Sequence, residues 1–120
     1  MSLVRRWMQA SSTSIATAIA DSAALLQSNA FEGQRKVIDV SGDGPDNSGG
    51  DLDGARNSAL TSGITINGLS IEAEEAGLHA YYLDHVIIGA DSFAEPAQGF
   101  EDFARAMKEK LLRELRPLGS

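Results

Sequence analysis

A chain of 120 residues with 42% hydrophobic and 22% charged residues has the length and composition of one globular domain, which argues against disorder. Its 17 acidic residues outnumber the 10 basic ones and give a net charge of -7, so we expect no nucleic-acid partner. Cysteine is absent, which excludes disulfides and thiolate metal sites. No apolar run reaches the roughly 18 residues of a membrane span, and we expect neither a span nor an export signal within the chain.

The first half of the chain alternates helix-like and strand-like segments. Residues 1–12 are predicted to form a terminal tail, and the cap-type residues at its end open a helix over about residues 13–28. β-Branched residues predict a strand over residues 35–41, and the lack of polar alternation beyond Asp39 indicates a strand covered on both faces. Glycines, carboxylates and a proline follow at residues 42–50 and indicate a polar loop.

A helix and a strand are predicted next. Asp51 can cap the helix, and Gly63 can end it. The following β-branched segment, residues 64–71, contains Asn67-Gly68, which is a hairpin signal. A strand that follows a helix after one glycine fits a β-α-β unit better, so we predict one continuous strand in which Gly68 is a bulge or a close-packing point.

The last third is predicted to contain a short helix, a strand and a long helix. The short helix lies within residues 72–84, and three apolar residues at 86–88 predict the strand. After a loop at 91–98, residues 99–115 show the clearest amphipathic pattern of the chain, and residues 116–120 form a second tail. The wet side of the long helix offers two i,i+4 ion pairs, Glu101 with Arg105 and Glu109 with Arg113.

This order of elements predicts a three-layer α/β/α fold with a Rossmann-like parallel sheet. About three strands are visible, which is few for a sheet that must be buried on both faces. We therefore expect an incomplete sheet whose first strands are missing, either because they lie upstream or because another chain supplies them.

Several segments, in this order, resemble von Willebrand factor A domains. TSIATAI at residues 13–19 is similar to their T-x-I-G-x-A-L segment, and residues 37–44 resemble their strand that ends in an Asp-Gly pair. The similarity continues through GITINGLSIE at 63–72, YYLDHVIIG at 81–89 and FEDFARAMKEKL at 100–111. Together these segments are similar to an uncharacterised bacterial subgroup of that superfamily, a domain of unknown function, over nearly the whole chain.

The resemblance implies a metal-ion-dependent adhesion site at the carboxyl ends of the strands, built from a D-x-S-x-S motif, a threonine and an aspartate. By motif match the threonine is Thr13 and the aspartate is Asp43, while Ser41, Asp46 and Asn47 complete the binding loop. No D-x-S-x-S motif precedes the threonine. We therefore expect the chain to be a single partial domain, the carboxyl-terminal part of a longer parent.

The same resemblance implies Mg²⁺ or another divalent cation in the intact parent. One hydroxyl and one carboxylate cannot supply the octahedral oxygen cage that Mg²⁺ requires, so we expect no tightly bound ion in this chain. The subgroup is often exported, which implies a periplasmic or extracellular parent.

Two other interpretations of the acidic loop stay open. GDGPDN at residues 42–47 resembles the G-D-G-x-N-D signature of magnesium-dependent haloacid-dehalogenase-like phosphatases, but Asp and Asn are exchanged, and no D-x-D-x-T nucleophile segment is present. Asp, Asn and Gly are also ordinary turn residues, which fits a structural domain whose metal site has decayed.

We expect a noncatalytic protein-binding module of the metal-ion-dependent adhesion type, with a protein as its partner. A missing central strand would leave the backbone of residues 36–40 unpaired along one edge. Pairing with a second copy would cover that edge, so we expect a homodimer joined through the sheet or by exchanged segments.

Overall fold

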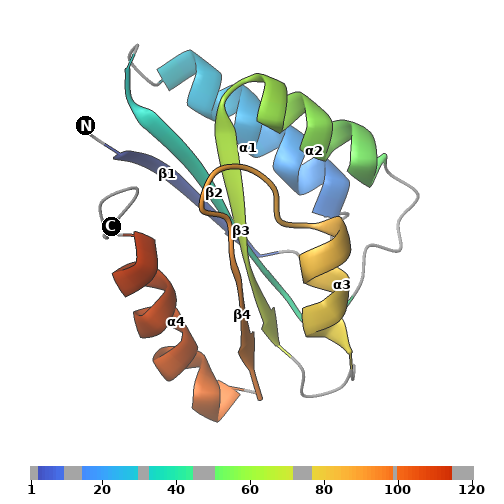
Figure 1. Ribbon diagram of the computed structural model, residues 1–120, viewed down its shortest axis with the longest axis vertical. Helices are drawn as coiled ribbons and strands as arrows, with labels where there is room; N and C mark the ends of the chain where they lie inside the picture. Colours follow the sequence, from blue (N-terminus) through green and yellow to red (C-terminus); the bar gives the residue numbers. More distant parts are fainter. Residues whose placement is uncertain are drawn as a thin grey trace.

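The computed structural model describes residues 3–9, 15–29, 33–44, 51–71, 77–98 and 100–114. These residues form a three-layer α/β/α fold of the Rossmann-like kind, as predicted (Figure 1). None of the described helices is both long enough and apolar enough to cross a membrane. In chain order the elements are β1 (Leu3–Gln9), α1 (Ile15–Asn29), β2 (Arg35–Gly42), α2 (Leu52–Thr61), β3 (Ile64–Ile71), α3 (Leu78–His85), β4 (Ala94–Ala97) and α4 (Phe100–Glu114).

The sheet is parallel throughout, and its strands lie in the order β1-β2-β3-β4. Each strand pairs with the next one along the chain, so successive crossovers of the same hand place α1, α2 and α3 on one face. Helix α4 follows the last strand and covers the other face, mainly over β3 and β4 (Figure 1). The registers place Arg5 beside Val37, and Val37 beside Thr65.

Strand β1 corrects two expectations from the sequence. Residues 3–9 form a full strand beside β2 and not the predicted terminal tail. The backbone of residues 36–40 is therefore paired on both sides and is no open edge. Consecutive arginines hid this strand, because the ion pair that accommodates Arg5 against Asp39 is formed only in the folded chain.

The fourth strand also lies where the sequence did not indicate it. Residues 86–88 are no strand: Val86 is the buried C-cap of α3, and Ile88 makes a single antiparallel bridge to Ile66. A short buried apolar run looks the same in a strand as at a helix end, which explains the error. Strand β4 lies at Ala94–Ala97 instead, where Pro96 is tolerated because an edge strand pairs on one side only.

Other local predictions are confirmed. The Asp51 carboxylate caps α2 by accepting a hydrogen bond of 2.9 Å from the backbone N–H of Gly54. Gly63 follows the helix with a φ of 76°, a conformation that glycine adopts without strain. Strand β3 is continuous, and Gly68 is a close-packing point, because a Cβ there would overlap the ring of Tyr82.

The two faces of the sheet are packed differently. Beneath α1, α2 and α3 lies an apolar core that includes Ile15, Ile19, Leu26, Ile38, Val40, Ile64, Ile66, Leu78, Tyr82 and Val86. Beneath α4 the buried apolar cluster of described residues contains Leu69, Ala97 and Ala106. These three side chains connect α4 to β3 and β4 through apolar contacts.

Charged groups among the described residues also attach α4 to the sheet. Lys110 and Asp39 are both fully buried, and the lysine Nζ lies 2.5 Å from Oδ1 of the aspartate. The second oxygen of Asp39 lies 3.2 Å from Nε of Arg5 on β1. Neither carboxylate oxygen has an aligned hydrogen bond, so these contacts are ion pairs by proximity of charge. Because an unpaired buried charge is costly, this arrangement selects one position of α4 on β2.

Of the two predicted ion pairs of α4, the pair of Glu109 with Arg113 is replaced by other partners. Arg105 pairs with Asp102 and Glu109, at 2.6 and 2.8 Å, and Arg113 pairs with Glu95 of β4 at 3.3 Å. The side chain of Glu101 lies outside the described residues. Helix spacing alone cannot show that a carboxylate of the neighbouring strand attracts Arg113.

Lys110→Met is expected to lower the free energy of unfolding by about 3 kcal/mol, because it leaves the buried Asp39 with Arg5 as its remaining ion-pair partner in the described structure. Urea unfolding followed by circular dichroism measures the change. Lys108→Met, at an exposed position of the same helix, is the matched control and should change stability by less than about 0.5 kcal/mol. Equal effects of the two substitutions would contradict a structural role for the ion pair.

Candidate functional site

The carboxyl end of β2 carries the candidate site. Residues 37–42 of this strand are buried, and the chain becomes exposed at Asp43, immediately after the strand ends. Ligands of open parallel sheets bind outside the carboxyl ends of the strands. Asp43 therefore lies at the edge of the sheet where ligands of such folds bind.

Ser41 and Asp43 are both predicted to belong to one site, but Ser41 is buried and Asp43 is exposed. Ser41 belongs to β2 and not to a loop, and it is 1% exposed. It lies on the same face of the strand as Asp39, which contacts α4. The serine hydroxyl thus belongs to the polar layer under α4, whereas Asp43 is available to solvent.

The remaining predicted site residues, Thr13, Asp46 and Asn47, lie outside the described residues. Within the described part of the chain, no group of three or more His, Cys, Asp or Glu side chains could hold a metal ion. Ser41 and Asp43 offer two oxygen-bearing side chains, and octahedral Mg²⁺ needs six oxygen ligands. The described residues by themselves therefore do not fit this ion.

Tyr82 is a candidate site residue that sequence reasoning missed. Its ring lies over Gly68, in the middle of β3. Helix α3 starts at the carboxyl edge of the sheet because it follows β3, and helical side chains lean toward the start of their helix. The side chain of Tyr82 therefore leans toward the edge at which Asp43 lies. A glycine within a run of β-branched residues was the signal in the sequence that an aromatic ring approaches there.

The hydroxyl of Tyr82 is buried and has no hydrogen-bond partner among the described residues. Burial raises the pKa of this phenol above its ordinary value of 10.0, and the charges of Tyr81 and Asp43 raise it further. The phenol therefore stays protonated and uncharged at neutral pH.

Ser70 presents a second buried hydroxyl without a hydrogen-bond partner in the described structure. It lies beside Gly42 in the register of β2 and β3, two residues beyond Gly68 on the same face. Buried polar groups are normally paired, so the unpaired hydroxyls of Tyr82 and Ser70 are exceptions among the described residues, as are the buried oxygens of Asp39. Chemically, this edge combines an exposed carboxylate with two neutral hydroxyl groups.

Comparison with known proteins yields one family. A family model described as "Protein of unknown function (DUF1194)" matches residues 2–119 of the chain. No curated protein and no solved structure gives a match. The resemblance to von Willebrand factor A domains stays a prediction from the sequence.

Tyr82→Phe is expected to leave the free energy of unfolding at pH 7 unchanged within about 0.5 kcal/mol, or to raise it. The substitution removes a buried hydroxyl without a partner among the described residues, and with it a desolvation cost. Urea unfolding at pH 7 measures the difference. A loss of more than about 1 kcal/mol would show that the hydroxyl makes a hydrogen bond in the folded protein.

The same variant has a second expected effect at alkaline pH. The folded pKa of Tyr82 is raised, so the contribution of the phenol to stability is complete below the unfolded value of 10.0 and is lost as pH rises above it. Wild-type stability should therefore fall more steeply than that of Tyr82→Phe between pH 9 and about 11.

Proposed function

This chain belongs to the protein family of unknown function DUF1194, and from that premise we propose that it is a noncatalytic protein-binding module. The proposed contact surface is the carboxyl edge of the parallel sheet, with Asp43 at its centre. The observation that carries the proposal is the position of Asp43, an exposed carboxylate at the point where a buried strand ends.

The rigidity of the edge supports this proposal. Strand β2 is paired on both sides, and its last six residues are buried, so the backbone that presents Asp43 is constrained. A constrained carboxylate loses little conformational entropy when it binds a partner. The paired and buried backbone of β2 therefore suits a binding surface that keeps its conformation when a partner binds.

The finer proposal is that the site is of the metal-ion-dependent adhesion type. Thr13 and Asp43 are its proposed ligands in this chain, and a D-x-S-x-S segment ahead of residue 1 is proposed to supply the others. The resemblance to von Willebrand factor A domains supports this assignment. When bound, a divalent cation would accept a carboxylate oxygen from the partner protein as a further ligand.

Asp43→Ala is expected to weaken Mg²⁺ binding at least tenfold in a chain extended upstream to include the first motif, because it removes an anionic ligand. Isothermal titration calorimetry measures the affinity. Asp21→Ala, an exposed carboxylate on α1, is the matched control and should bind as the wild type does.

Two other results, one from a phosphatase assay and one from the same titration, would favour the alternative functions. Release of p-nitrophenol from p-nitrophenyl phosphate, if Asp43→Ala abolished it, would favour the phosphatase interpretation and contradict a noncatalytic module. Absence of Mg²⁺ binding in both the wild type and the control would favour a structural domain with a decayed site.

We also propose a homodimer that is joined through the outer edge of β1. This strand has seven residues, and no strand pairs with its outer edge in the described structure. The opposite edge strand, β4, has four residues and contains Pro96, which limits pairing. Pairing of two β1 edges would join the sheets of two copies.

Light scattering after size-exclusion chromatography is expected to give about twice the chain mass of 12.7 kDa. The expectation follows from the length of the unpaired β1 edge. A mass of one chain across the accessible concentration range would contradict the dimer and leave the proposed binding edge unaffected.

A further inference from the structure

The sheet has a second outer edge, on the side of β4, and two segments form it. Strand β4 pairs with the carboxyl half of β3, from Gly68 to Ile71, and the edge segment, residues 88–93, runs beside the amino half (Figure 1). An open edge presents N–H and C=O groups that can pair with a strand of another molecule. Whether a second copy can add to this side of the sheet depends on both segments.

The edge segment occupies the backbone groups of β3 that point away from β2. The N–H of Ile66 donates to the carbonyl of Ile88 at 2.8 Å, and the N–H of Ile88 donates to the carbonyl of Ile66 at 3.2 Å. The N–H of Gly68 donates to the carbonyl of Phe93 at 3.0 Å. Because these three groups of β3 are already paired, they cannot pair with a strand of another molecule.

Contacts from two other elements fix the edge segment in place. Arg56 of α2 donates from Nη2 to the carbonyl of Ile87, directly before the segment, at 2.8 Å. The hydroxyl of Thr65 on β3 donates to the carbonyl of Ala90 at 3.2 Å. Gly89 has a φ of 104°, and a Cβ there would lie 2.9 Å from Cα of Thr65, so the segment packs directly on the backbone of β3.

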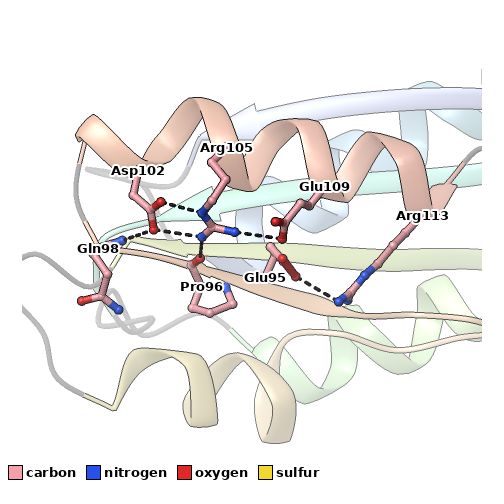
Figure 2. A network of polar contacts seen from close by, with 7 residues as sticks. All are labelled: Glu95, Pro96, Gln98, Asp102, Arg105, Glu109 and Arg113. Atoms are coloured by element: carbon pink, nitrogen blue, oxygen red, sulfur yellow. Dashed lines mark hydrogen bonds and ion pairs between the residues drawn. The ribbon is translucent and has the colours of Figure 1, made fainter.

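Strand β4 forms the rest of this edge, and Pro96 is the residue that limits pairing along it. The carbonyl of Phe93 faces β3, and carbonyls alternate in direction along a strand, so the carbonyls of Ala94 and Pro96 point outward. Pro96 has no N–H, and its carbonyl accepts a hydrogen bond of 3.1 Å from Nη2 of Arg105 on α4 (Figure 2). Position 96 therefore offers no donor, and its acceptor is engaged within the chain.

The guanidinium group of Arg105 is held beside Pro96 by carboxylates of its own helix. Its Nε lies 2.6 Å from Oδ1 of Asp102, its Nη2 lies 2.9 Å from Oδ2, and its Nη1 lies 2.8 Å from Oε2 of Glu109 (Figure 2). Asp102 also accepts a hydrogen bond of 3.1 Å from the backbone N–H of Gln98. A bidentate pair of arginine and carboxylate fixes the orientation of the guanidinium group. Arg105 is thereby directed at the outward carbonyl of β4.

The two outer strands of the sheet differ in the features that prevent pairing. Natural edge strands are protected when they are short, contain proline or turn a charged side chain inward. Strand β4 has four residues, includes Pro96, and buries Glu95, which pairs with Arg113 of α4 at 3.3 Å. Strand β1 has seven residues and no proline. Strand addition is therefore favoured at β1 over β4.

We propose that the β4 side of the sheet is closed to strand addition, so that pairing between copies of this chain uses the β1 edge alone and stops at two chains. A chain with one pairing edge forms a closed dimer, whereas a chain with two such edges assembles without end. The limit of two chains rests on the proposed homodimer. The closure of the β4 side is independent of that dimer and of the proposed binding edge around Asp43.

A double variant that opens the edge at position 96 tests the closure. Pro96→Val restores an outward N–H, and Arg105→Ala releases the carbonyl of the same residue. In light scattering, the weight-average mass of the double variant should rise with protein concentration and reach at least twice the mass of the wild type. The wild type should keep one mass over the same range of concentration.

Pro96→Val combined with Lys108→Ala is the matched control, because it removes a positive charge at an exposed position of α4 and keeps Arg105. This control should have the mass of the wild type, and equal growth of both double variants would overturn the role of Arg105. A double variant with the wild-type mass would overturn the closure, as would a wild type that grows beyond two chains. A wild type of one chain beside a larger double variant would contradict the homodimer and support the closure.

Hydrogen exchange of the wild type tests the edge segment without any variant. The amides of Ile66 and Gly68 point to the outer edge, and those of Thr65 and Asn67 point toward β2. The first two should exchange no more than about tenfold faster than the other two, because the edge segment pairs with them. Exchange of Ile66 and Gly68 at the rate of unpaired amides would overturn the closure.

Discussion

One buried carboxylate joins three elements of this fold. Asp39 lies on β2, and its two oxygens face Arg5 of β1 and Lys110 of α4. A charge at this depth is tolerated only beside opposite charges, so the edge strand and the last helix must both be in place when β2 is buried. The positions of β1 and α4 relative to β2 therefore depend on the pairing of Asp39 with Arg5 and Lys110.

The two faces of the sheet consequently differ in what stabilises them. Three helices bury a continuous apolar core on one face, and that packing depends on shape and area. On the other face, the described contacts of the single helix α4 combine apolar side chains with charged pairs. Ion pairs depend on charge and on direction, so single charge changes at Lys110 or Arg113 act on the attachment of α4.

The candidate binding edge depends on the apolar face. Asp43 directly follows a strand that is paired on both sides. The ring of Tyr82 packs on β3 because Gly68 has no side chain there. The close packing of Tyr82 on Gly68 brings a neutral hydroxyl to the interior near an exposed carboxylate. The rigidity of the edge and its chemistry thus have the same structural origin.

The sequence alone determined the fold class, the continuity of the strand through Gly68 and the cap at Asp51, because these follow from local periodicity and from the backbone preferences of single residues. It missed β1 and β4, whose arginines and proline disfavour strands until a neighbouring strand and an opposite charge are present. Only the tertiary structure placed Asp39 against Lys110, buried the hydroxyl of Tyr82 and paired Arg113 with Glu95. Such contacts join residues far apart in the chain, and no local pattern records them, since their energy depends on burial that exists only after folding.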